Sequence, residues 1–541
     1  MIAQTVNSGD TAWLLTCAAL VLFMTPGLAF FYAGMVRGRN SLVMMQQNFI
    51  PLGVVSLTWV LFGYSLAFGN DRGGGFVGDL GAFGLRNLAD APPPGLHVVS
   101  TAVAVPTLAF AAYQMMFAII TPALATGAVA DRMKFAGWAC FLTIWSVVVY
   151  APIAHWLWAP AGWLTHRGAQ DWAGGMVVHA AAGATALALL VVLGKRKVWP
   201  DAAPMPHSIP LVIVGAGILW FGWFGFNAGD GLQADGVAAQ ALVNTHVAGA
   251  VAMLVWLILE KVREGRPTVL GGVTGAVAGL ATITPAAGYV STLSALVIGA
   301  LAALVCHFAL RAKYFFKFDD ALDVIAVHFV GGVLGSLLLG LFGEEAINSI
   351  GADGLFFGGG ATLLGWQLVA LISVIAFSFC LTWLIATGIE KTIGLRVDAA
   401  DEDRLDQAQQ GMDAYHFSQV VGLGGDRPTP GPAASSVTNE SDGPLVVVTT
   451  VVDLDDSQVA ELKQALVDAG ARRIVATEAH VFTGEVDTVT VRNQERTMEF
   501  VTRARVEVLV PQSRAGHVNA AFEQFASGAT PWFTTDVGSV G

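Results

Sequence analysis

The sequence predicts an all-α polytopic membrane protein of about eleven transmembrane helices, arranged as an inverted five-helix repeat and followed by an α+β ferredoxin-like domain. The 541 residues are 55% hydrophobic and only 13% charged, whereas soluble domains carry about 25% charged residues. Mean hydropathy is correspondingly high, at +0.62. Apolar runs of about 20 residues, the length that crosses a bilayer, recur as far as residue 390. Strand and helix patterns of ordinary soluble polarity begin after residue 444.

The predicted membrane helices follow from the apolar runs in chain order. They lie at 11–35, 43–68, 98–128, 136–157, 173–193, 208–229, 237–260, 268–287, 290–310, 320–342 and 360–390. No basic region typical of a signal peptide precedes the first run, so we expect it to remain as a helix. Basic residues gather in every second loop, at Arg37, Arg39, Arg132, Lys134, Lys195, Arg196, Lys197, Lys261, Arg263, Arg266, Arg311, Lys313 and Lys317. Because basic loops stay inside, we expect a multi-pass protein of the cell inner (cytoplasmic) membrane, with its N-terminus outside and its C-terminal domain cytoplasmic.

Two histidines, His179 and His328, lie late in two of the apolar runs. An ionisable residue at membrane depth is costly, usually faces the bundle interior and marks an ion or proton path. A simple interhelical hydrogen bond is the alternative for either residue alone. An odd number of helices suggests two five-helix halves inserted in opposite senses, with one histidine on the last helix of each half. Because such halves place their sites near the midplane between them, we expect the two histidines to meet.

Charge and cysteine content exclude several classes of protein. The net charge of -12 and the pI near 5.3 argue against nucleic acid as a partner, which needs a concentrated basic surface. Cys17, Cys140, Cys306 and Cys380 lie in apolar segments and show neither metal-ligand spacing nor a disulfide framework. The sequence shows no nucleophile–base pair or metal-ligand cluster, so we expect no enzyme activity, and no metal or cofactor in the membrane domain.

Seven segments of the membrane part occur in a recognisable order. They are GMVRGRNSL (34–42), YQMMFAIITPAL (113–124), DWAGGMVVH (171–179), GWFGFNAGD (222–230), ITPAAGYV (283–290), DVIAVH (323–328) and GLRV (394–397). This series resembles the successive signatures of the ammonium transporter (Amt/Mep/Rh) family over about residues 10–415. The resemblance implies that ammonium is the substrate, that a lipid bilayer surrounds the helices, and that a homotrimer forms in which each subunit has its own narrow pore.

The resemblance also assigns residues to the pathway. Trp158 and Phe117 resemble the aromatic cage that receives ammonium at the outer mouth, and Phe226 with Phe117 resembles the paired phenyl gate below it. An aromatic face attracts a cation by about 0.5–2 kcal/mol, although membrane aromatics taken alone are more often anchors or core residues. His179 and His328 resemble the twin-histidine pair of the pore, which carries or relays the proton while neutral ammonia passes. Deprotonating ammonium at neutral pH costs about 3–5 kcal/mol, less than moving a bare cation through an apolar constriction.

Acidic residues near these positions have several interpretations. Asp171 lies eight residues before His179, at the expected outer start of its helix, where a carboxylate caps backbone donors, so we interpret it as structural support. Asp230 departs from the family, which usually has serine there. Its carboxylate is expected to strengthen ammonium capture, to slow release, or to turn a transporter into a sensor. We expect the three carboxylates before the second histidine to form ion pairs with nearby lysines: Asp319, Asp320 and Asp323 with Lys313 or Lys317.

The composition changes after the last predicted helix. Residues 1–396 are the predicted membrane domain, 397–444 a cytoplasmic tail and a flexible linker rich in Pro, Gly and Ser, and 445–541 a separate domain. Patterns in this last domain predict strand, helix, strand, strand, helix and strand, which is the split ferredoxin-like order. That order, the pair Thr477 and Glu478, and the long segment between the second and third strands resemble the nitrogen-regulatory P-II protein.

Only some of the features of P-II proteins are present in this domain. SGATPWF (527–533) replaces the glycine-rich phosphate loop, so a nucleotide, another small ligand, or no ligand at all remains open for this domain. Arg492 and Arg496 lie in a polar segment, 490–500, that we expect to be mobile. The resemblance implies that this segment acts on the pore in cis or on another protein, and an ordinary solvated charge run is the alternative.

The sequence therefore predicts ammonium transport across the cell membrane, with regulation by a fused P-II-like domain. The alternative is an ammonium sensor with little or no transport that signals through the C-terminal domain. Asp230 is the residue that favours this alternative.

Overall fold

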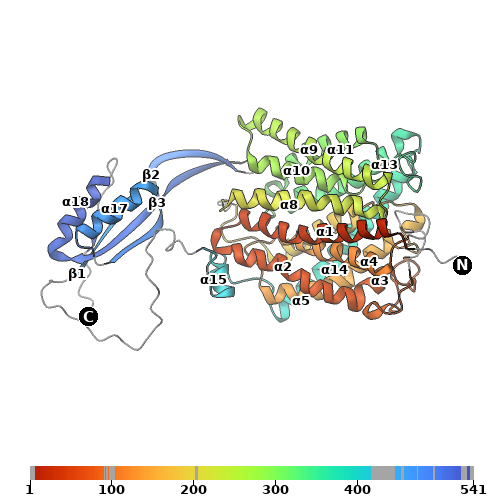
Figure 1. Ribbon diagram of the computed structural model, residues 1–541, viewed down its shortest axis with the longest axis horizontal. Coiled ribbons are helices and arrows are strands. Elements are labelled where there is room, and N and C mark those ends of the chain that lie inside the picture. The colour runs from red at the N-terminus through yellow and green to blue at the C-terminus, as the bar shows by residue number, and fades with distance from the viewer. Residues whose placement is uncertain are drawn as a thin grey trace. The chain divides into compact units, whose positions relative to one another are not determined.

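The computed structural model describes residues 6–90, 92, 96, 104–200, 205–415, 445–452, 456–471, 473–491, 494–525 and 533–535. These residues belong to two compact units, Met1–Ala414 and Tyr415–Gly541. Figure 1 shows the first as a bundle of helices that run roughly along one direction, and the second as a sheet covered by two helices.

The first unit is mainly helical. Its longer helices are α1 (Ser8–Met35), α2 (Ser41–Thr58), α4 (Thr107–Ala125), α5 (Phe135–Trp145), α6 (Ala151–Trp158), α7 (Ala181–Leu193), α8 (Ile209–Ala228), α9 (Gly236–Glu264), α10 (Val269–Ile283), α11 (Thr292–Ala309), α13 (Val330–Phe342) and α14 (Thr362–Thr392). Shorter helices are α3 (Tyr64–Phe68), α12 (Ala312–Phe315) and α15 (Leu405–Gln410). One π-helical turn joins α2 to α3, another joins α5 to α6, and one each precedes α7 and α13. Within the described residues, 10 of the resulting segments are long and apolar enough to cross a membrane.

The remaining predicted span, 268–287, is shorter than the sequence suggested. It forms α10, which has 15 residues and ends at Ile283, two residues before Pro285, which has no N–H to continue the helical hydrogen bonds. Glycines bring α10 against α9: a Cβ at Gly279 would lie 2.5 Å from the carbonyl oxygen of Ala248. Small residues allow such close approach between membrane helices.

The predicted span 98–128 is also shorter in the structure. α4 begins at Thr107, directly after Pro106, and ends at Ala125. Proline suits the start of a helix because it has no N–H to leave unpaired. Residues 97–103 lie outside the described part of the chain.

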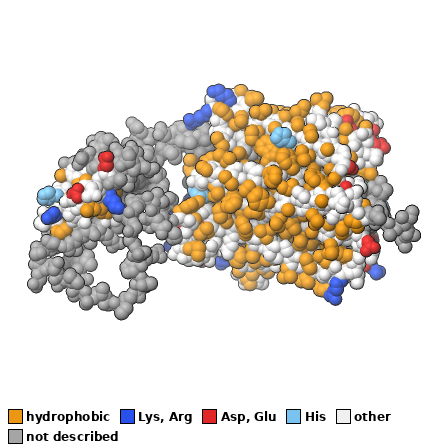
Figure 2. Space-filling model, in the orientation of Figure 1, with side chains coloured by type: hydrophobic (Ala, Val, Ile, Leu, Met, Phe, Trp, Pro, Cys, Tyr) orange, Lys and Arg blue, Asp and Glu red, His pale blue; other side chains and the backbone are white. Residues whose placement is uncertain are grey.

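The outer surface of the first unit is apolar. Figure 2 shows hydrophobic side chains over most of its visible face, with charged side chains gathered toward the two ends of the helices. Leu254, Ile258 and Val262 on α9 and Leu293 on α11 are among the exposed hydrophobic residues. Apolar side chains over this surface suit contact with lipid. The helices also satisfy their own backbone hydrogen bonds, as a bilayer requires.

The second unit follows the order β-α-β-β-α-β. Its elements are β1 (Leu445–Val452), α17 (Asp456–Asp468), β2 (Arg473–Val491), β3 (Gln494–Pro511), α18 (Ala515–Phe525) and β4 (Phe533–Thr535). The sheet has the strand order β2-β3-β1-β4 with antiparallel pairs. Leu462 and Leu466 of α17 and Val518 and Phe522 of α18 pack with Val508 of β3 in its core.

The described residues of the segment 490–500 lie on the paired strands β2 and β3, and its mobility stays a prediction. β2 and β3 pair up to Val491 and Gln494, and Arg496 stands opposite Val489. Alternating valine and threonine on β2 favour strand over loop, since β-branched residues fit a pleated backbone. Arg492 lies outside the described residues.

Candidate functional site

The two membrane histidines meet, as the sequence predicted. Nδ1 of His179 lies 3.2 Å from Nδ1 of His328. The two rings are nearly parallel, with 19° between their planes and 5.3 Å between their centroids. Both residues are buried, with 1% and 4% of their surface exposed. Two facing ring nitrogens form a hydrogen bond only when one carries a proton and the other does not, so the pair shares one proton.

Each histidine lies on a π-helical turn. His179 belongs to the turn Gly175–Ala180, which leads into α7, and His328 belongs to the turn Ile325–Phe329, which leads into α13. π-helical turns are rare and occur frequently at functional sites. The same local backbone therefore presents both histidines.

Asp171 caps the first of these turns. Its carboxylate is fully buried and accepts hydrogen bonds at 2.6–3.2 Å from the backbone N–H groups of Gly174, Gly175, Met176 and Val177. A carboxylate that accepts several backbone N–H groups fixes the start of a helix and satisfies donors that would otherwise be buried without partners. Asp171 thus sets the position of the turn that carries His179.

Asp320 occupies the corresponding place before His328. It also lies eight residues before its histidine, and its carboxylate accepts the backbone N–H groups of Val324 at 3.1 Å and Ile325 at 2.7 Å. Our prediction of a lysine ion pair is wrong for Asp320, whose carboxylate faces these amides. It is correct for Asp323, which pairs with Lys313.

A narrow apolar cavity contains the histidine pair. The other lining residues are aliphatic, aromatic or methionine, including Ile120 and Leu124 of α4 and Trp223 of α8. The volume open to the centre of a water-sized molecule is about 10 Å³, close to the least that holds one water. Nε2 of His179 is buried and has no hydrogen-bond partner among the described residues. A small polar molecule in this cavity would therefore find its hydrogen-bonding partner at the histidines.

The aromatic residues that the sequence singled out form one row leading to the histidines. Trp158 stands edge-on to Phe117 with 5.7 Å between centroids, and Phe117 contacts Phe226 at 4.3 Å. Phe226 lies 6.2 Å from the ring of His179. Nε1 of Trp158 donates to the carbonyl oxygen of Asp171 at 3.0 Å, so Asp171 positions both the Trp158 ring and the turn that carries His179.

Asp230 lies beside this row. It is fully buried in the 3-10 turn Gly229–Gly231, one turn beyond Phe226. Nε2 of Gln114 donates to its Oδ1 at 3.4 Å. Neither Gln114 nor Trp223, which stacks on His179 at 5.5 Å, was identified from the sequence, although both lie within the motifs at 113–124 and 222–230.

Comparison with known proteins identifies the family. The chain matches the Ammonium Transporter Family over residues 12–415. It belongs to this family. The ammonium transporter of Mycobacterium tuberculosis is 44% identical over 438 residues, which are 77% of this chain and 92% of that protein. The ammonium transporter of Bacillus subtilis is 41% identical over 417 residues, 76% of this chain and 100% of that protein.

Solved structures agree with this assignment. Candida albicans Mep2 has a TM-score of 0.67 and 34% identity, covering 73% of this chain and 88% of that chain. A protein described as "Sensor Amt Protein" has a TM-score of 0.67 and 28% identity, covering 74% of this chain and 98% of that chain. The membrane unit thus has the fold of an ammonium transporter, and the chain is a membrane transporter of this family rather than an enzyme.

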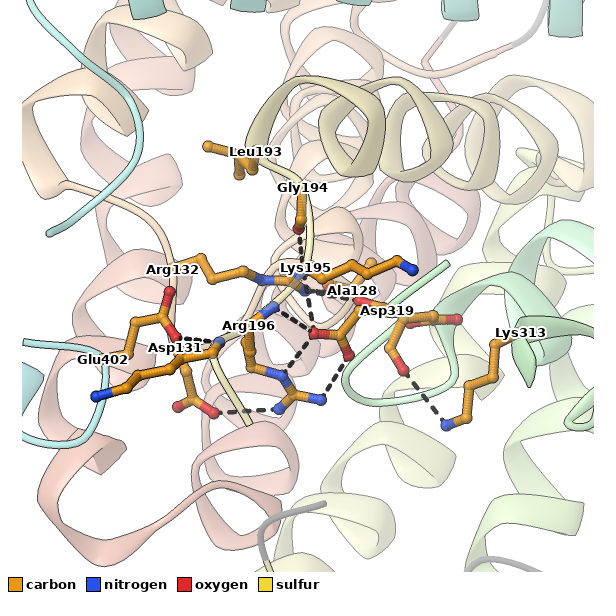
Figure 3. A network of polar contacts seen from close by, with 12 residues as sticks. Ala128, Asp131, Arg132, Leu193, Gly194, Lys195, Arg196, Lys313, Asp319 and Glu402 are labelled. Atoms are coloured by element: carbon orange, nitrogen blue, oxygen red, sulfur yellow. Dashed lines mark hydrogen bonds and ion pairs between the residues drawn. The ribbon is translucent and has the colours of Figure 1, made fainter. Parts of the chain in front are cut away.

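A buried ionic network lies next to Asp320 in this transporter (Figure 3). Asp319 accepts hydrogen bonds from the backbone N–H, Nε and Nη2 of Arg196 at 2.8, 3.0 and 2.7 Å, and lies 3.4 Å from Arg132. Arg196 also pairs with Asp131 at 3.2 Å. Burial opposes ionisation of Asp319, but the two arginines outweigh it and hold its pKa below the ordinary value. The predicted lysine partners are therefore wrong for Asp319, whose partners are arginines from two other loops.

The chain after α14 is bound to the same network. Glu402 accepts the backbone N–H of Lys197 at 2.8 Å and pairs with Arg396. The carboxylate of Asp406 accepts the backbone N–H groups of Leu42 and Val43 at 3.0 and 2.8 Å. Glu402 thus holds the chain after α14 against the loop that carries Arg196, and Asp406 holds it against the start of α2. No group of three or more potential metal ligands occurs in the described part of the chain.

Proposed function

We propose that this protein carries ammonium across the cell membrane by capturing the cation at an outer aromatic site, removing its proton and passing neutral ammonia. One observation supports this above the others: the two proton-sharing histidines, 3.2 Å apart, provide the polar side chains of an otherwise apolar cavity. Family membership supports the substrate, and the relatives from Mycobacterium tuberculosis and Bacillus subtilis are described as ammonium transporters.

The outer residues suit a small cation. Phe117 and Trp158 offer aromatic faces, each of which attracts a cation by about 0.5–2 kcal/mol. The Asp230 carboxylate lies one turn from Phe226 and adds a negative charge that favours the charged form of the ligand. The phenyl rings of Phe117 and Phe226 are in contact, so a ligand passes only when they move apart.

The inner cavity suits ammonia rather than ammonium. Giving up a proton at neutral pH costs about 3–5 kcal/mol, whereas a bare ion in an apolar passage costs more. The unpartnered Nε2 of His179 can accept a hydrogen bond from ammonia or receive a proton. Potassium has no proton to give up, so the same cavity excludes it.

Current recordings from proteoliposomes challenged with ammonium test this proposal. His179→Ala and His328→Ala should each abolish selective ammonium current or convert it to leak of other cations. His307→Ala is the matched control, because His307 is buried in α11 but does not line the cavity. Selective currents that survive both cavity substitutions would refute the deprotonation mechanism.

We further propose that the protein is an inverted repeat that forms homotrimers, with its N-terminus outside the cell. The repeat is supported by the matching elements Asp171 with His179 and Asp320 with His328, each an aspartate eight residues before a histidine on a π-helical turn. The orientation is supported by the basic residues of alternate loops. Labelling of single cysteines from either side of intact cells would test it.

The C-terminal unit is proposed to be a P-II-like ferredoxin-like domain that regulates the pore in cis or acts on another protein. Its strand order β2-β3-β1-β4, with α17 and α18, supports the fold. Residues 527–532, which stand in place of the P-II phosphate loop, lie outside the described residues, so a nucleotide, another small ligand and no ligand all stay open for this domain. The chain after α14 connects this unit to the ionic network of Asp319. Asp319 directly precedes Asp320, which caps the turn that carries His328, so a change in the network can reach the pore.

A sensor is the second candidate function. Asp230 supports it, since a buried carboxylate beside the aromatic residues would hold ammonium more firmly than the usual serine. The structural likeness to the protein described as "Sensor Amt Protein" also supports it. The recordings above separate the two functions, because a sensor with a blocked pore gives a brief binding transient and a transporter gives a sustained current.

A further inference from the structure

Gln114 lies on the outer side of the phenyl pair. On α4, Ile120 and Leu124 follow Phe117 by one and two turns, and both line the histidine cavity. Gln114 precedes Phe117 by one turn on the same helix. It therefore lies across the phenyl pair from the cavity, at the side that ammonium reaches first.

On α8, the residues that line the cavity precede the phenyl ring in sequence instead of following it. Trp223 and Leu219 precede Phe226 by one and two turns and line the cavity. Asp230 follows Phe226 by one turn. Gln114 and Asp230 therefore meet at one level, and Tyr113 joins their helices there by donating its hydroxyl hydrogen toward the carbonyl oxygens at the end of α8.

The chemistry of the contact fixes the orientation of the glutamine amide. Nε2 of Gln114 donates to Oδ1 of Asp230 at 3.4 Å, so the amide NH₂ group faces the Asp230 side chain. Its Oε1 then points elsewhere. That oxygen is buried and has no partner among the described residues, which is unfavourable unless a ligand or water donates a hydrogen bond to it.

We infer that Gln114 determines specificity at the outer site: its Oε1, together with the Asp230 carboxylate, accepts N–H groups of ammonium and so favours ammonium over methylated amines. The inference rests on the proposed capture of ammonium at this site. Ammonium carries N–H groups in all four directions, so two oxygens and the aromatic faces are satisfied together. Methylammonium keeps three N–H groups, one fewer than the four partners formed by Oε1, the Asp230 carboxylate and the faces of Phe117 and Trp158, so one partner faces its methyl group instead. A site built to accept hydrogen bonds discriminates strongly against a ligand that lacks the donor.

Gln114→Leu tests the inference, because leucine fills similar space and offers no acceptor. Half-saturating concentrations of ammonium and methylammonium would be measured by titrating the purified protein. The preference for ammonium over methylammonium should fall about tenfold or more. Gln114→Met, which also lacks an acceptor oxygen and has an unbranched side chain of similar length, should lower the preference likewise and serves if the leucine variant does not fold. Gln367→Leu is the matched control, since Gln367 is equally buried but binds Gln170 and Ser336 instead.

Trp158→Leu separates this inference from the proposed function. If the Trp158 variant loses affinity while a folded Gln114→Leu protein keeps its full preference, the outer site stands and the inference about Gln114 is overturned. If neither variant changes affinity or preference, the outer capture site itself is wrong. A reduced preference in Gln114→Leu, with wild-type preference in the Gln367→Leu control, supports the inference.

Discussion

Replacing Asp171 by asparagine should destabilise the protein far more than the same change at Asp320. The Asp171 carboxylate uses one oxygen for Gly174 and Gly175 and the other for Met176 and Val177. Asparagine keeps one oxygen and places an amide NH₂ against the other two donors. Each buried N–H left without a partner costs about 1–3 kcal/mol, so Asp171→Asn should cost about 2–6 kcal/mol.

Asp320→Asn has two opposing effects. One backbone N–H, from Val324 or Ile325, loses its acceptor at a cost of about 1–3 kcal/mol. The buried charge is removed at the same time. Burial, with the nearby charge of Asp323, raises the pKa of Asp320 from 3.8 to about 6, so its ionised form is disfavoured by about 3 kcal/mol at neutral pH. The two effects roughly cancel, and the stability of Asp320→Asn at pH 7 should stay close to that of the wild type.

Thermal unfolding in detergent, followed by circular dichroism, measures this difference. Asp171→Asn should lower the midpoint by several degrees and reduce ammonium flux, because the turn that carries His179 loosens. Asp235→Asn is the control: Asp235 caps α9 by accepting one N–H from Ala238 at 2.9 Å, and asparagine caps as well as aspartate. If the unfolding midpoint falls equally in the Asp171 and Asp320 variants, the number of backbone N–H groups that each carboxylate accepts does not determine how much it stabilises the protein.

Three further outcomes are expected. Asp230→Ser and Asp230→Asn should each weaken the apparent affinity for ammonium at the outer face, and identical titrations of all three proteins would mean that the carboxylate does not face the ligand. Because the pKa of Asp320 is raised to about 6, its stabilising contribution is complete below about pH 4 and lost as the pH rises through 6. The wild-type midpoint should therefore fall relative to that of Asp320→Asn between pH 4 and 7, and a constant difference would contradict the raised pKa. Deleting residues 445–541, or replacing Arg492 and Arg496 by alanine, should raise ammonium flux under conditions that inhibit the intact protein. The tether gives the domain an effective concentration of about a millimolar, so even weak binding to the pore would inhibit it. Equal flux at every metabolite concentration would leave the domain as a sensor or adaptor for another protein.

The sequence was sufficient for features that depend on repetition and periodicity. Apolar length predicted the membrane segments, and the two histidine runs predicted that His179 and His328 meet. Boundaries were less predictable, because prolines shorten two of the apolar runs: Pro106 precedes the start of α4, and Pro285 follows the end of α10. Apolar composition continues across both points and hides them.

Partner choice within the DDALD segment could not be predicted from composition. Three carboxylates within five residues find three kinds of partner: arginines for Asp319, backbone amides for Asp320 and a lysine for Asp323. Sequence proximity favoured lysine for all three, because Arg132 and Arg196 are more than 100 residues away along the chain. The spacing of Asp320 and His328 nevertheless equals that of Asp171 and His179, and this repeat was the signal for the capping role.

Asp230 creates a conflict between capture and transport that the proposed mechanism must resolve. An opposite charge within about 4–6 Å raises the pKa of a bound amine by about 1–3 units. The same charge that draws ammonium in therefore raises the cost of removing its proton by about 1.4–4 kcal/mol, which slows that step by about ten- to a thousandfold. If deprotonation limits flux, Asp230→Ser should weaken affinity and at the same time increase the maximal sustained current. Weaker affinity with an unchanged maximal current would show that another step, such as separation of Phe117 from Phe226, limits transport. A protein that carries no sustained current until Asp230 is replaced would be a sensor because of this carboxylate.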